Sequence, residues 1–238
     1  MAPAVSADGE EAVLKIQEPH RETEHEAAAL ELWDGEGAVR LLAQNPEEHA
    51  LLLERCVPGT PLAAAGAETA LDVFAELLPR LWKPAGAPFR PLAEEARWWL
   101  ESLESTWERF GRPFERRLLD AGLEALRELA PTQAEQVLLH QDLHGENVLA
   151  AQREPWLAID PKPLAGEREF GLAPIVRSRE LGHSRRDVLH RLDRLSAELG
   201  LDRERARGWA VGQTLAWAFN GRCRETHVET ARWLVEAD

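Results

Sequence analysis

Cysteine is scarce in this sequence, with only Cys56 and Cys223 among 238 residues. Two cysteines so far apart cannot form a disulfide scaffold, and such sparse use is typical of a reducing compartment. The chain also lacks any apolar run near the roughly 20 residues that a membrane-spanning helix requires. Its first residues lack the basic and then apolar order of a signal peptide. We therefore expect a cytoplasmic protein with no membrane partner.

Positive charge is also in short supply. The chain has 28 Lys and Arg against 42 Asp and Glu, which gives a formal net charge of −14. Binding to nucleic acid needs clustered positive charge against the phosphate backbone, so this balance argues against such a partner. It favours a cationic small molecule instead. The length allows one large domain or two small lobes around a cleft.

The N-terminal region predicts a β-α-β-β arrangement that follows a loose end at residues 1–10. Short β-type runs alternate here with one helical pattern, and turn residues separate them. The expected elements are a strand at Ala12–Ile16, a helix at Glu22–Trp33, and strands at Ala38–Leu42 and Ala50–Glu54.

After Val57 the pattern becomes mainly helical, with one compact group of short strands. The aromatic and apolar residues Trp99, Leu103 and Trp107 recur at helical spacing, which is typical of a core-facing stripe. This change of character predicts two regions, residues 1–56 and residues 57–238. The expected helices are Thr69–Leu81, Leu92–Phe110, Pro113–Leu129, Arg185–Leu199, Asp202–Phe219 and Thr226–Glu236, and the expected strands are Gln136–His140, Asn147–Ala150 and Trp156–Ile159.

One segment carries most of the chemical information. An apolar strand runs into the loop His140–Asn147, and a later strand ends in Asp160. The spacing H-x-D-x-x-x-x-N with a strand-end aspartate downstream matches the arrangement of kinases. In that arrangement Asp142 would take the proton of a substrate hydroxyl, and Asn147 and Asp160 would hold Mg²⁺.

A zinc site is the alternative interpretation of the same loop, because His140 and His144 could ligate a metal from one face of a helix. Gly145 and the strand-like runs on both sides argue against a helix there. The pattern therefore favours Mg²⁺ over zinc.

The same kind of site requires a lysine for the nucleotide phosphates and a glutamate that holds this lysine. Lys15 lies in a strand of the appropriate type, and either Glu24 or Glu26 on the following helix could supply the carboxylate. We expect Glu24, because Ala27 and Ala28 at helical spacing leave room for the strand to approach. Glu26 is expected on a solvated face.

The run Leu51–Gly59 leaves the β-rich region and enters the helical one. In a two-lobed enzyme such a crossover is a hinge, and its free backbone groups can bind the edge of an adenine. By that geometry the acceptor is the carbonyl of Arg55 and the donor is the amide of Val57.

Together these motifs resemble the aminoglycoside and hydroxyurea antibiotic resistance kinases, and within that family the streptomycin 6-kinase group. The resemblance rests on Gly35–Leu42, Leu51–Arg55, His140–Leu149 and Ile159–Leu164. It implies an α+β, protein-kinase-like fold with a small β-rich lobe and a large helical lobe. It further implies ATP and Mg²⁺ as cofactors and transfer of the γ-phosphoryl group to a hydroxyl of a small molecule, such as a streptomycin-type aminoglycoside or hydroxyurea.

The family also implies Asp142 as the base, Asn147 and Asp160 as metal ligands, and Lys15 on the α- and β-phosphates. Its members carry two further strands ahead of the lysine strand, which form a flap over the phosphates. Residues 1–11 are all that precede Ala12 here, so the flap strands are expected to be missing.

Two alternatives stay open beside the antibiotic kinase. A missing flap motivates the first, a catalytically weak remnant that binds a nucleotide or ligand. The second is a different enzyme, a sugar or amino-alcohol kinase of the same fold. If the acceptor is cationic, the candidate carboxylates on the helical part are Glu101, Glu104 and Glu108.

Overall fold

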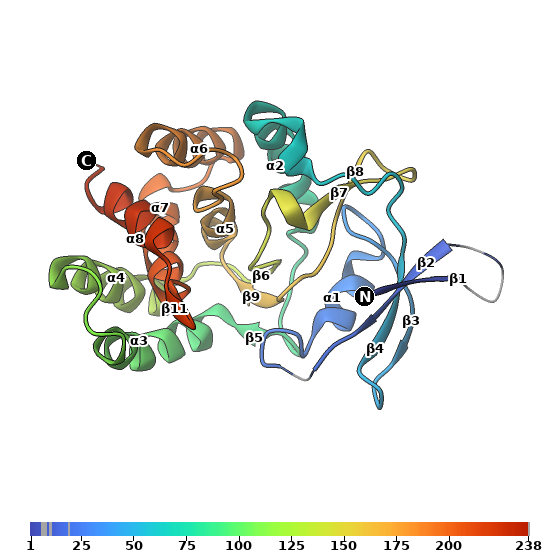
Figure 1. Cartoon of the computed structure of the whole chain (residues 1–238), viewed down its shortest axis with the longest axis horizontal. Helices are drawn as coiled ribbons and strands as arrows, with labels where there is room; N and C mark the ends of the chain where they lie inside the picture. Colours follow the sequence, from blue (N-terminus) through green and yellow to red (C-terminus); the bar gives the residue numbers. More distant parts are fainter. Residues whose placement is uncertain (6–8, 10, 19, 238) are drawn as a thin grey trace.

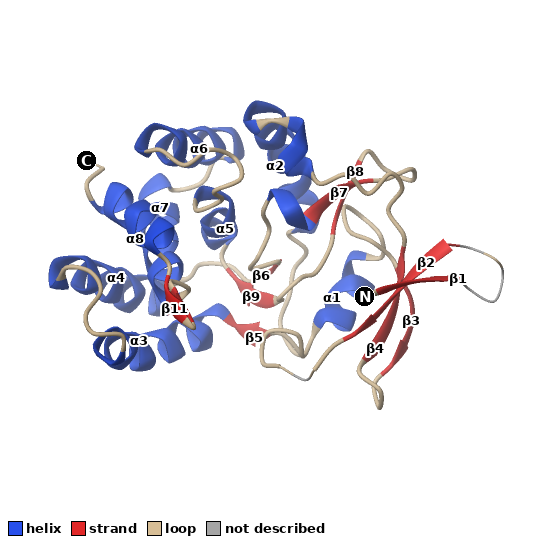
Figure 2. Ribbon diagram, in the orientation of Figure 1, coloured by secondary structure: helices blue, strands red, loops and turns tan. Residues whose placement is uncertain are grey.

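The computed structural model of the chain describes residues 1–5, 9, 11–18 and 20–237. A small sheet-rich part at the N-terminus adjoins a larger helical part, as Figures 1 and 2 show. This is the α+β arrangement that the sequence predicts. Within the described residues, no helix combines the length and the apolarity needed to cross a membrane.

The sheet of the N-terminal part is antiparallel, in the order β1-β2-β4-β3. Its strands are β1 (Ala2–Val5), β2 (Glu11–Ile16), β4 (Ala50–Glu54) and β3 (Leu41–Asn45). Leu51 and Leu53 alternate along β4 and are both buried, as expected for a strand with one face on the core. They join the same apolar cluster as Leu30 of helix α1 (Glu26–Trp33), so α1 and this sheet share one core.

The prediction of a loose end is wrong for residues 2–5, because these residues form β1, which pairs with β2 and places Ala2 opposite Leu14. A run of four residues is too short to show a periodic pattern, and its pairing with a distant strand decides its structure. Residues 6–8 and 10 of the predicted loose end lie outside the described residues. Among the residues that the structure describes, one strand, β1, therefore precedes the lysine strand.

Helix α1 begins at Glu26 rather than at Glu22. The amide of Thr23 and its hydroxyl both donate to the carbonyl of His20, and the amide of Glu26 donates to the carbonyl of Thr23. Such local bonds compete with the first turn of a helix. The strand predicted from Ala38 likewise begins only at Leu41.

The C-terminal part is built around α7 (Arg203–Ala216), whose Trp209 is fully buried. Close approach of α7 to α4 (Arg116–Leu129) depends on Gly212, where an added Cβ would lie 2.6 Å from Leu126. The other helices are α2 (Ala67–Leu81), α3 (Leu92–Arg109), α5 (Ala173–Val176), α6 (Arg185–Leu199) and α8 (Glu225–Val235).

Short strands lie where the two parts meet. One small sheet has the order β5-β9-β6, and β7 forms a hairpin with β8. The hairpin also touches the N-terminal part, because the amide of Val39 donates to the carbonyl of Ala158 at 3.0 Å. These strands are β5 (Arg90–Pro91), β9 (Leu164–Gly166), β6 (Val137–Leu139), β7 (Val148–Ala150) and β8 (Trp156–Ala158).

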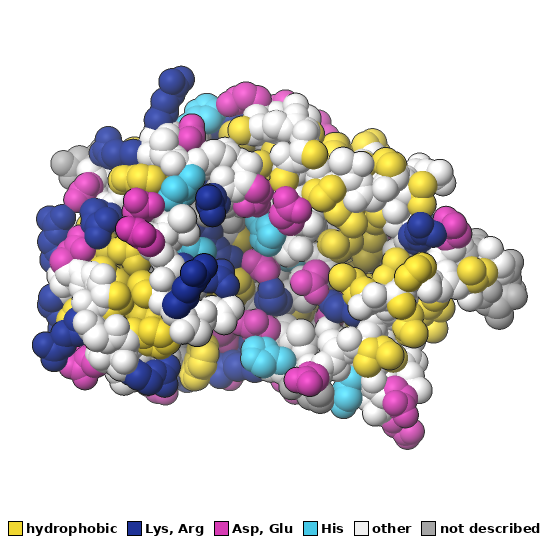
Figure 3. Space-filling model, in the orientation of Figure 1, with side chains coloured by type: hydrophobic (Ala, Val, Ile, Leu, Met, Phe, Trp, Pro, Cys, Tyr) yellow, Lys and Arg dark blue, Asp and Glu magenta, His cyan; other side chains and the backbone are white. Residues whose placement is uncertain are grey.

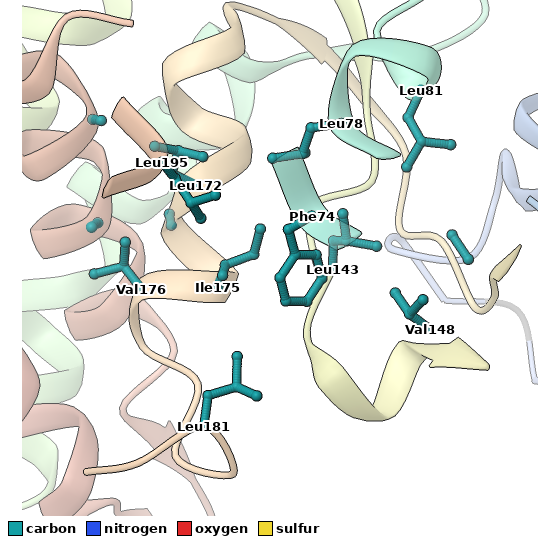
Figure 4. Packing of buried hydrophobic residues seen from close by; sticks show 14 of the residues in the cluster. Phe74, Leu78, Leu81, Leu143, Val148, Leu172, Ile175, Val176, Leu181 and Leu195 are labelled. Carbon is teal, nitrogen blue, oxygen red and sulfur yellow. The ribbon is translucent and has the colours of Figure 1, made fainter. Parts of the chain in front are cut away.

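The apolar core continues beneath the loop that follows β6. Leu143 of this loop is 1% exposed and lies beside Phe74 of α2, with Val148 nearby (Figure 4). On α3 the predicted stripe is confirmed, because Trp99 and Leu103 are buried. The loop is therefore anchored to the helical part by an apolar side chain.

Candidate active site

Asp142 lies in the loop that follows β6. Hydrogen bonds to the backbone of Gln141 and Asp142 hold this loop in place. The preceding Gln141 has a left-handed backbone with φ of +65°, and its carbonyl accepts a bond of 3.0 Å from Nε2 of Gln213. The side-chain amide of Asn147 donates to the carbonyl of Asp142 at 2.9 Å. With Leu143 in the core, these contacts direct the carboxylate of Asp142 away from the core and into a cleft.

Two cations hold the carboxylate of Asp142. Arg177 donates from Nη2 to one oxygen at 2.9 Å, and Nζ of Lys162 contacts the other. The guanidinium of Arg177 lies over the ring of Trp217, 4.3 Å from its centroid. Burial lowers the pKa of Arg177 to about 10, which still leaves the group charged at neutral pH. Asp142 is thus oriented by charge as well as by its backbone.

The two histidines of the loop have different partners. Nε2 of His140 donates to the carbonyl of Ile159 at 2.9 Å, and the ring stacks on Trp33. Burial lowers the pKa of His140 to about 4, so the imidazole is neutral at physiological pH. His144 instead contacts Glu180 through Nδ1 at 3.2 Å. The arrangement does not support a shared metal, and the described residues contain no group of three His, Cys, Asp or Glu that could hold one.

Lys15 brings three elements together. Its Nζ lies 2.7 and 2.6 Å from the two carboxylate oxygens of Glu26 and 2.5 Å from Oδ1 of Asp160. Glu26 belongs to α1, and Asp160 follows β8 with a left-handed backbone at φ +56°. The lysine of β2 therefore connects the helix of the N-terminal part to the strand-end aspartate.

The prediction of Glu24 as the partner of Lys15 is wrong. The side chain of Glu24 is 64% exposed, whereas that of Glu26 is 1% exposed and holds the lysine. The reason is the start of α1, which places Glu26 in the first turn on the same face as the buried residues Ala29 and Leu30.

Opposing effects act on the two carboxylates that contact Lys15. Burial raises the pKa of Glu26 above its ordinary value, although the charge and hydrogen bond of Lys15 lower it. At Asp160 burial also raises the pKa, but the contacts with Lys15 and the charge of Lys162 outweigh it, and the pKa lies below its usual value. Asp160 is therefore an ionised carboxylate at neutral pH.

The residues around Asp160 fit a divalent cation with hard oxygen ligands. Asn147 lies close in the fold, because its carbonyl accepts a bond of 3.0 Å from the amide of Ile159, next to Asp160. One carboxylate and one amide oxygen form the sparse protein donor set typical of Mg²⁺, which takes its other ligands from water and phosphates.

A cavity of about 380 Å³ opens beside Lys15 and Asp160. Its walls are mainly apolar, and β1 contributes to them through Ala2 and Pro3. Arg55 lines this cavity but Val57 does not, so of the two expected hinge residues only one is at its wall. The apolar lining residues are Val13, Val39, Leu53, Leu149 and Ile159.

A second cleft, of about 580 Å³, surrounds the carboxylate of Asp142. Figure 3 shows basic, acidic and histidine side chains gathered in the hollow between the two parts of the molecule. The residues that line the cleft include His20 and Glu22 from the N-terminal part. The expected acceptor carboxylates of α3 do not line it, and Glu104 and Glu108 instead pair with arginines at the surface.

Sequence reasoning missed several residues of this cleft. Lys162 lies two positions after Asp160 in the motif that carries the resemblance, and this proximity was the available signal. Arg177 and Trp217 directly follow the ends of α5 and α7, and no local pattern marks them.

Protein kinases and their small-molecule relatives combine a lysine–glutamate pair with a loop aspartate and a strand-end aspartate between two lobes. Fold and site together define a small-molecule kinase of this kind. The chain belongs to the aminoglycoside/hydroxyurea antibiotic resistance kinase family, which it matches over residues 1–223.

Two curated relatives illustrate the similarity. The chain is 42% identical over 220 residues to a streptomycin 6-kinase from Streptomyces glaucescens, covering 90% of this chain and 71% of that protein. It is 44% identical over 219 residues to a hydroxyurea phosphotransferase from Kitasatospora aureofaciens, covering 90% of this chain and 63% of that protein. The chain thus spans less than two thirds of the second relative.

Among solved structures, the fold is similar to choline kinase LicA from Streptococcus pneumoniae. The TM-score is 0.70 at 14% identity, and the match covers 99% of this chain and 89% of that chain. LicA in complex with AMP gives a TM-score of 0.65 at 14% identity, covering 95% of this chain and 84% of that chain. At this identity the likeness concerns the fold alone.

Proposed function

We propose that this protein transfers the γ-phosphoryl group of ATP to a hydroxyl group of a small molecule, with Mg²⁺ as the metal. The observation that carries the proposal is the alternating series of charges from Glu26 through Lys15 to Asp160, which lies next to the pair of Lys162 and Asp142. This series joins the apolar cavity to the cleft around Asp142, as a transfer between two substrates requires.

The nucleotide belongs in the cavity beside Lys15. Its apolar walls suit an adenine ring, and LicA, a protein of similar fold, has been solved with AMP. The carbonyl of Arg55 and the amide of Val57 remain the proposed contacts for the edge of the base. In this proposal residues 1–56 and 57–238 are the two lobes, and Lys15, held by Glu26, contacts the α- and β-phosphates.

Asn147 and Asp160 are the proposed metal ligands. Bound there, Mg²⁺ would neutralise charge on the β- and γ-phosphate oxygens. The chain itself keeps the Asp160 carboxylate ionised through Lys15 and Lys162 and fixes the backbone beside Asn147.

Asp142 is the proposed proton acceptor. Its carboxylate is held by Arg177 and Lys162 at the base of the cleft, where the hydroxyl of an acceptor can reach it. Positioning of this hydroxyl and neutralisation of phosphate charge supply most of the rate enhancement in such enzymes.

Streptomycin and hydroxyurea, which the names of the relatives supply, are the first acceptors to test. The excess of acidic residues over the whole chain favours a cationic acceptor. A sugar or amino alcohol is the alternative acceptor, and a nucleotide-binding remnant of low activity is the alternative function. Two free cysteines and the use of ATP support a cytoplasmic location.

The test is acceptor-dependent formation of ADP by the whole chain, with streptomycin, hydroxyurea, choline and glycerol as acceptors and the phosphorylated product detected by ³¹P NMR. We expect turnover with at least one acceptor, and its loss without Mg²⁺. Binding of Mg·ATP by calorimetry with no product from any acceptor would reject the transferase and favour the remnant.

A further inference from the structure

Lys162 lies close to both aspartates of the site. Strands β6 and β9 pair antiparallel, so the loop after β6 and the segment before β9 leave the sheet side by side. The amide of Lys162 donates to the carbonyl of His140 at 3.0 Å, which extends this pairing beyond the sheet. Asp142 follows His140 by two residues, and Asp160 precedes Lys162 by two. Lys162 is therefore close to Asp142 in space and to Asp160 along the chain.

The backbone of Lys162 has little freedom. Pro161 and Pro163 flank it, and both are buried. Each proline holds its own φ at about −65° and restricts the residue before it. The side chain of Lys162 is 20% exposed and lies in the cleft, with Nζ 5.5 Å from the ring centroid of Trp217. Any movement of this ammonium group therefore comes from its flexible four-carbon stem.

Three lysine and arginine side chains of the described residues contact the two aspartates, and two of them are firmly held. Lys15 is 9% exposed and is bound by two carboxylates. The guanidinium of Arg177 is 7% exposed and lies over the ring of Trp217. Lys162 is more exposed, and within the part of the chain that the structure describes its ammonium has a single carboxylate partner, Asp142. Lys162 is thus the cation that can most easily change its partner.

The contact of Lys162 with Asp142 opposes the proposed role of this carboxylate as a base. Arg177 donates to Oδ1 of Asp142 and Lys162 donates to Oδ2, so each oxygen faces a cation. A carboxylate oxygen that accepts a bond from an ammonium is a poorer acceptor for the proton of a hydroxyl, because the positive charge favours the ionised form. Activation of the acceptor hydroxyl therefore improves when Oδ2 is released.

We propose that Lys162 binds the γ-phosphoryl group of ATP and thereby releases Oδ2 of Asp142 for the acceptor hydroxyl. A lysine ammonium is a compact charge that binds phosphate oxygens, and a cation on the transferred group stabilises the charge of the transition state. The acceptor oxygen forms its bond to the γ-phosphorus as the bond to the bridging oxygen of ADP breaks, and the acceptor proton passes to Oδ2. Lys162 keeps its own proton throughout. This inference rests on the proposed function and adds a catalytic residue to it.

Calorimetric titration with ATP and with ADP, both with Mg²⁺, tests the contact without relying on activity. Lys162→Met should weaken ATP binding about tenfold, as for loss of a charge-assisted hydrogen bond, and leave ADP binding unchanged because ADP has no γ-phosphate. Lys162→Arg keeps a cation and should retain most of the preference for ATP. Lys83→Met is the matched control, because Lys83 also precedes a proline and pairs with a carboxylate, that of Glu36, but lines neither the cavity nor the cleft.

The same titrations with Asp142→Asn test the exchange of partners. Asparagine has no charge to hold Lys162, so the ammonium is available for the γ-phosphate from the start. The preference for ATP over ADP should therefore rise about threefold, as for release of a partly exposed ion pair. Asp120→Asn, in an exposed pair on α4, should leave the preference unchanged. A lysine that served only to orient Asp142 would give no change in either variant.

The outcomes separate this inference from the proposed function. An unchanged ATP preference in Lys162→Met, or equal weakening of ATP and ADP binding, would overturn the inference and leave the transferase in place if the unmodified protein turns over an acceptor. Loss of the preference in Lys162→Met, in a protein that phosphorylates no acceptor, would keep the γ-phosphate contact and reject the transferase. Failure of the unmodified protein to bind either nucleotide would reject both.

Discussion

Nζ of Lys15 lies 2.6 Å from Oε2 of Glu26, and both side chains are almost completely buried. Because burial alone would favour a neutral glutamic acid, the ionised pair depends on this contact. The position of α1 therefore determines the direction of the Lys15 side chain. Because Lys15 also contacts Asp160, the position of α1 is linked to that of Asp160 as well.

Replacement of Glu26 by Gln should weaken Mg·ATP binding about tenfold and lower the free energy of unfolding by about 2 kcal/mol, because it leaves a buried ammonium with one carboxylate instead of two. Calorimetry and urea denaturation measure the two effects. Glu24→Gln is the matched control, since it makes the same change at an exposed position two residues earlier. Equal effects of the two variants would contradict the role of Glu26.

The choice between Glu24 and Glu26 shows where sequence patterns stop being sufficient. Lys15 and Asp160 could be predicted because each has a strand context that repeats across kinases. The partner of Lys15 depends on where α1 begins, and a turn stabilised by His20 and Thr23 decides that. The two-part fold and most helix positions follow from local periodicity, whereas β1 exists only through its pairing with β2.

The cleft was harder to predict for a related reason. Arg177, Trp217 and Arg224 lie far apart along the chain from Asp142, and tertiary packing alone brings them together. The net charge of the chain is an average over the whole surface, so it gave no guide to the charge of this one cleft. Glu101, Glu104 and Glu108 were reasonable candidates only because their position in space was unknown.

Asp142→Asn should lower kcat about 10³-fold while Mg·ATP binding is retained, because the amide cannot accept the proton of the acceptor. The fold should survive, since the bond from Asn147 goes to the backbone of Asp142. Steady-state kinetics with the acceptor found above and calorimetry with Mg·ATP make the comparison. Asp120→Asn, in an exposed pair on α4, is the control; similar turnover in both variants would exclude Asp142 as the base.

Asp160→Ala should abolish the gain in ATP affinity that Mg²⁺ produces in the unmodified protein, because Asp160 supplies the one carboxylate of the proposed donor set. ATP is titrated with and without Mg²⁺ in each protein. The metal-free titration also tests Lys15, which loses its 2.5 Å contact with Asp160 in the variant but keeps its contacts with Glu26. A full Mg²⁺ effect in the variant would show that Asp160 is not a ligand.

The stability of the fold should fall as the pH drops from 6.5 to 5, and His140 should account for part of the loss. Burial holds the pKa of His140 at about 4, against 6.5 for an ordinary histidine. Between these values the unfolded chain binds a proton that the folded one does not, so the unfolding free energy decreases by about 1.4 kcal/mol per pH unit for this group. His227, with a pKa of about 3, acts in the same direction.

Carboxylates with lowered pKa values, such as Glu180 at about 2, contribute stability that is lost only as the pH falls below 4.5. Glu26, whose pKa burial raises, acts in the opposite direction, so the contribution of His140 is isolated by comparing variants in urea denaturation at pH 7.5, 6.5, 5.75 and 5. His140→Gln should reduce the slope below pH 6.5 by about 1 kcal/mol per pH unit, because glutamine does not titrate. His190→Gln makes the same replacement at an exposed site on α6 and serves as the matched variant. An unchanged slope in His140→Gln would mean that His140 takes up its proton equally in the folded and unfolded chains.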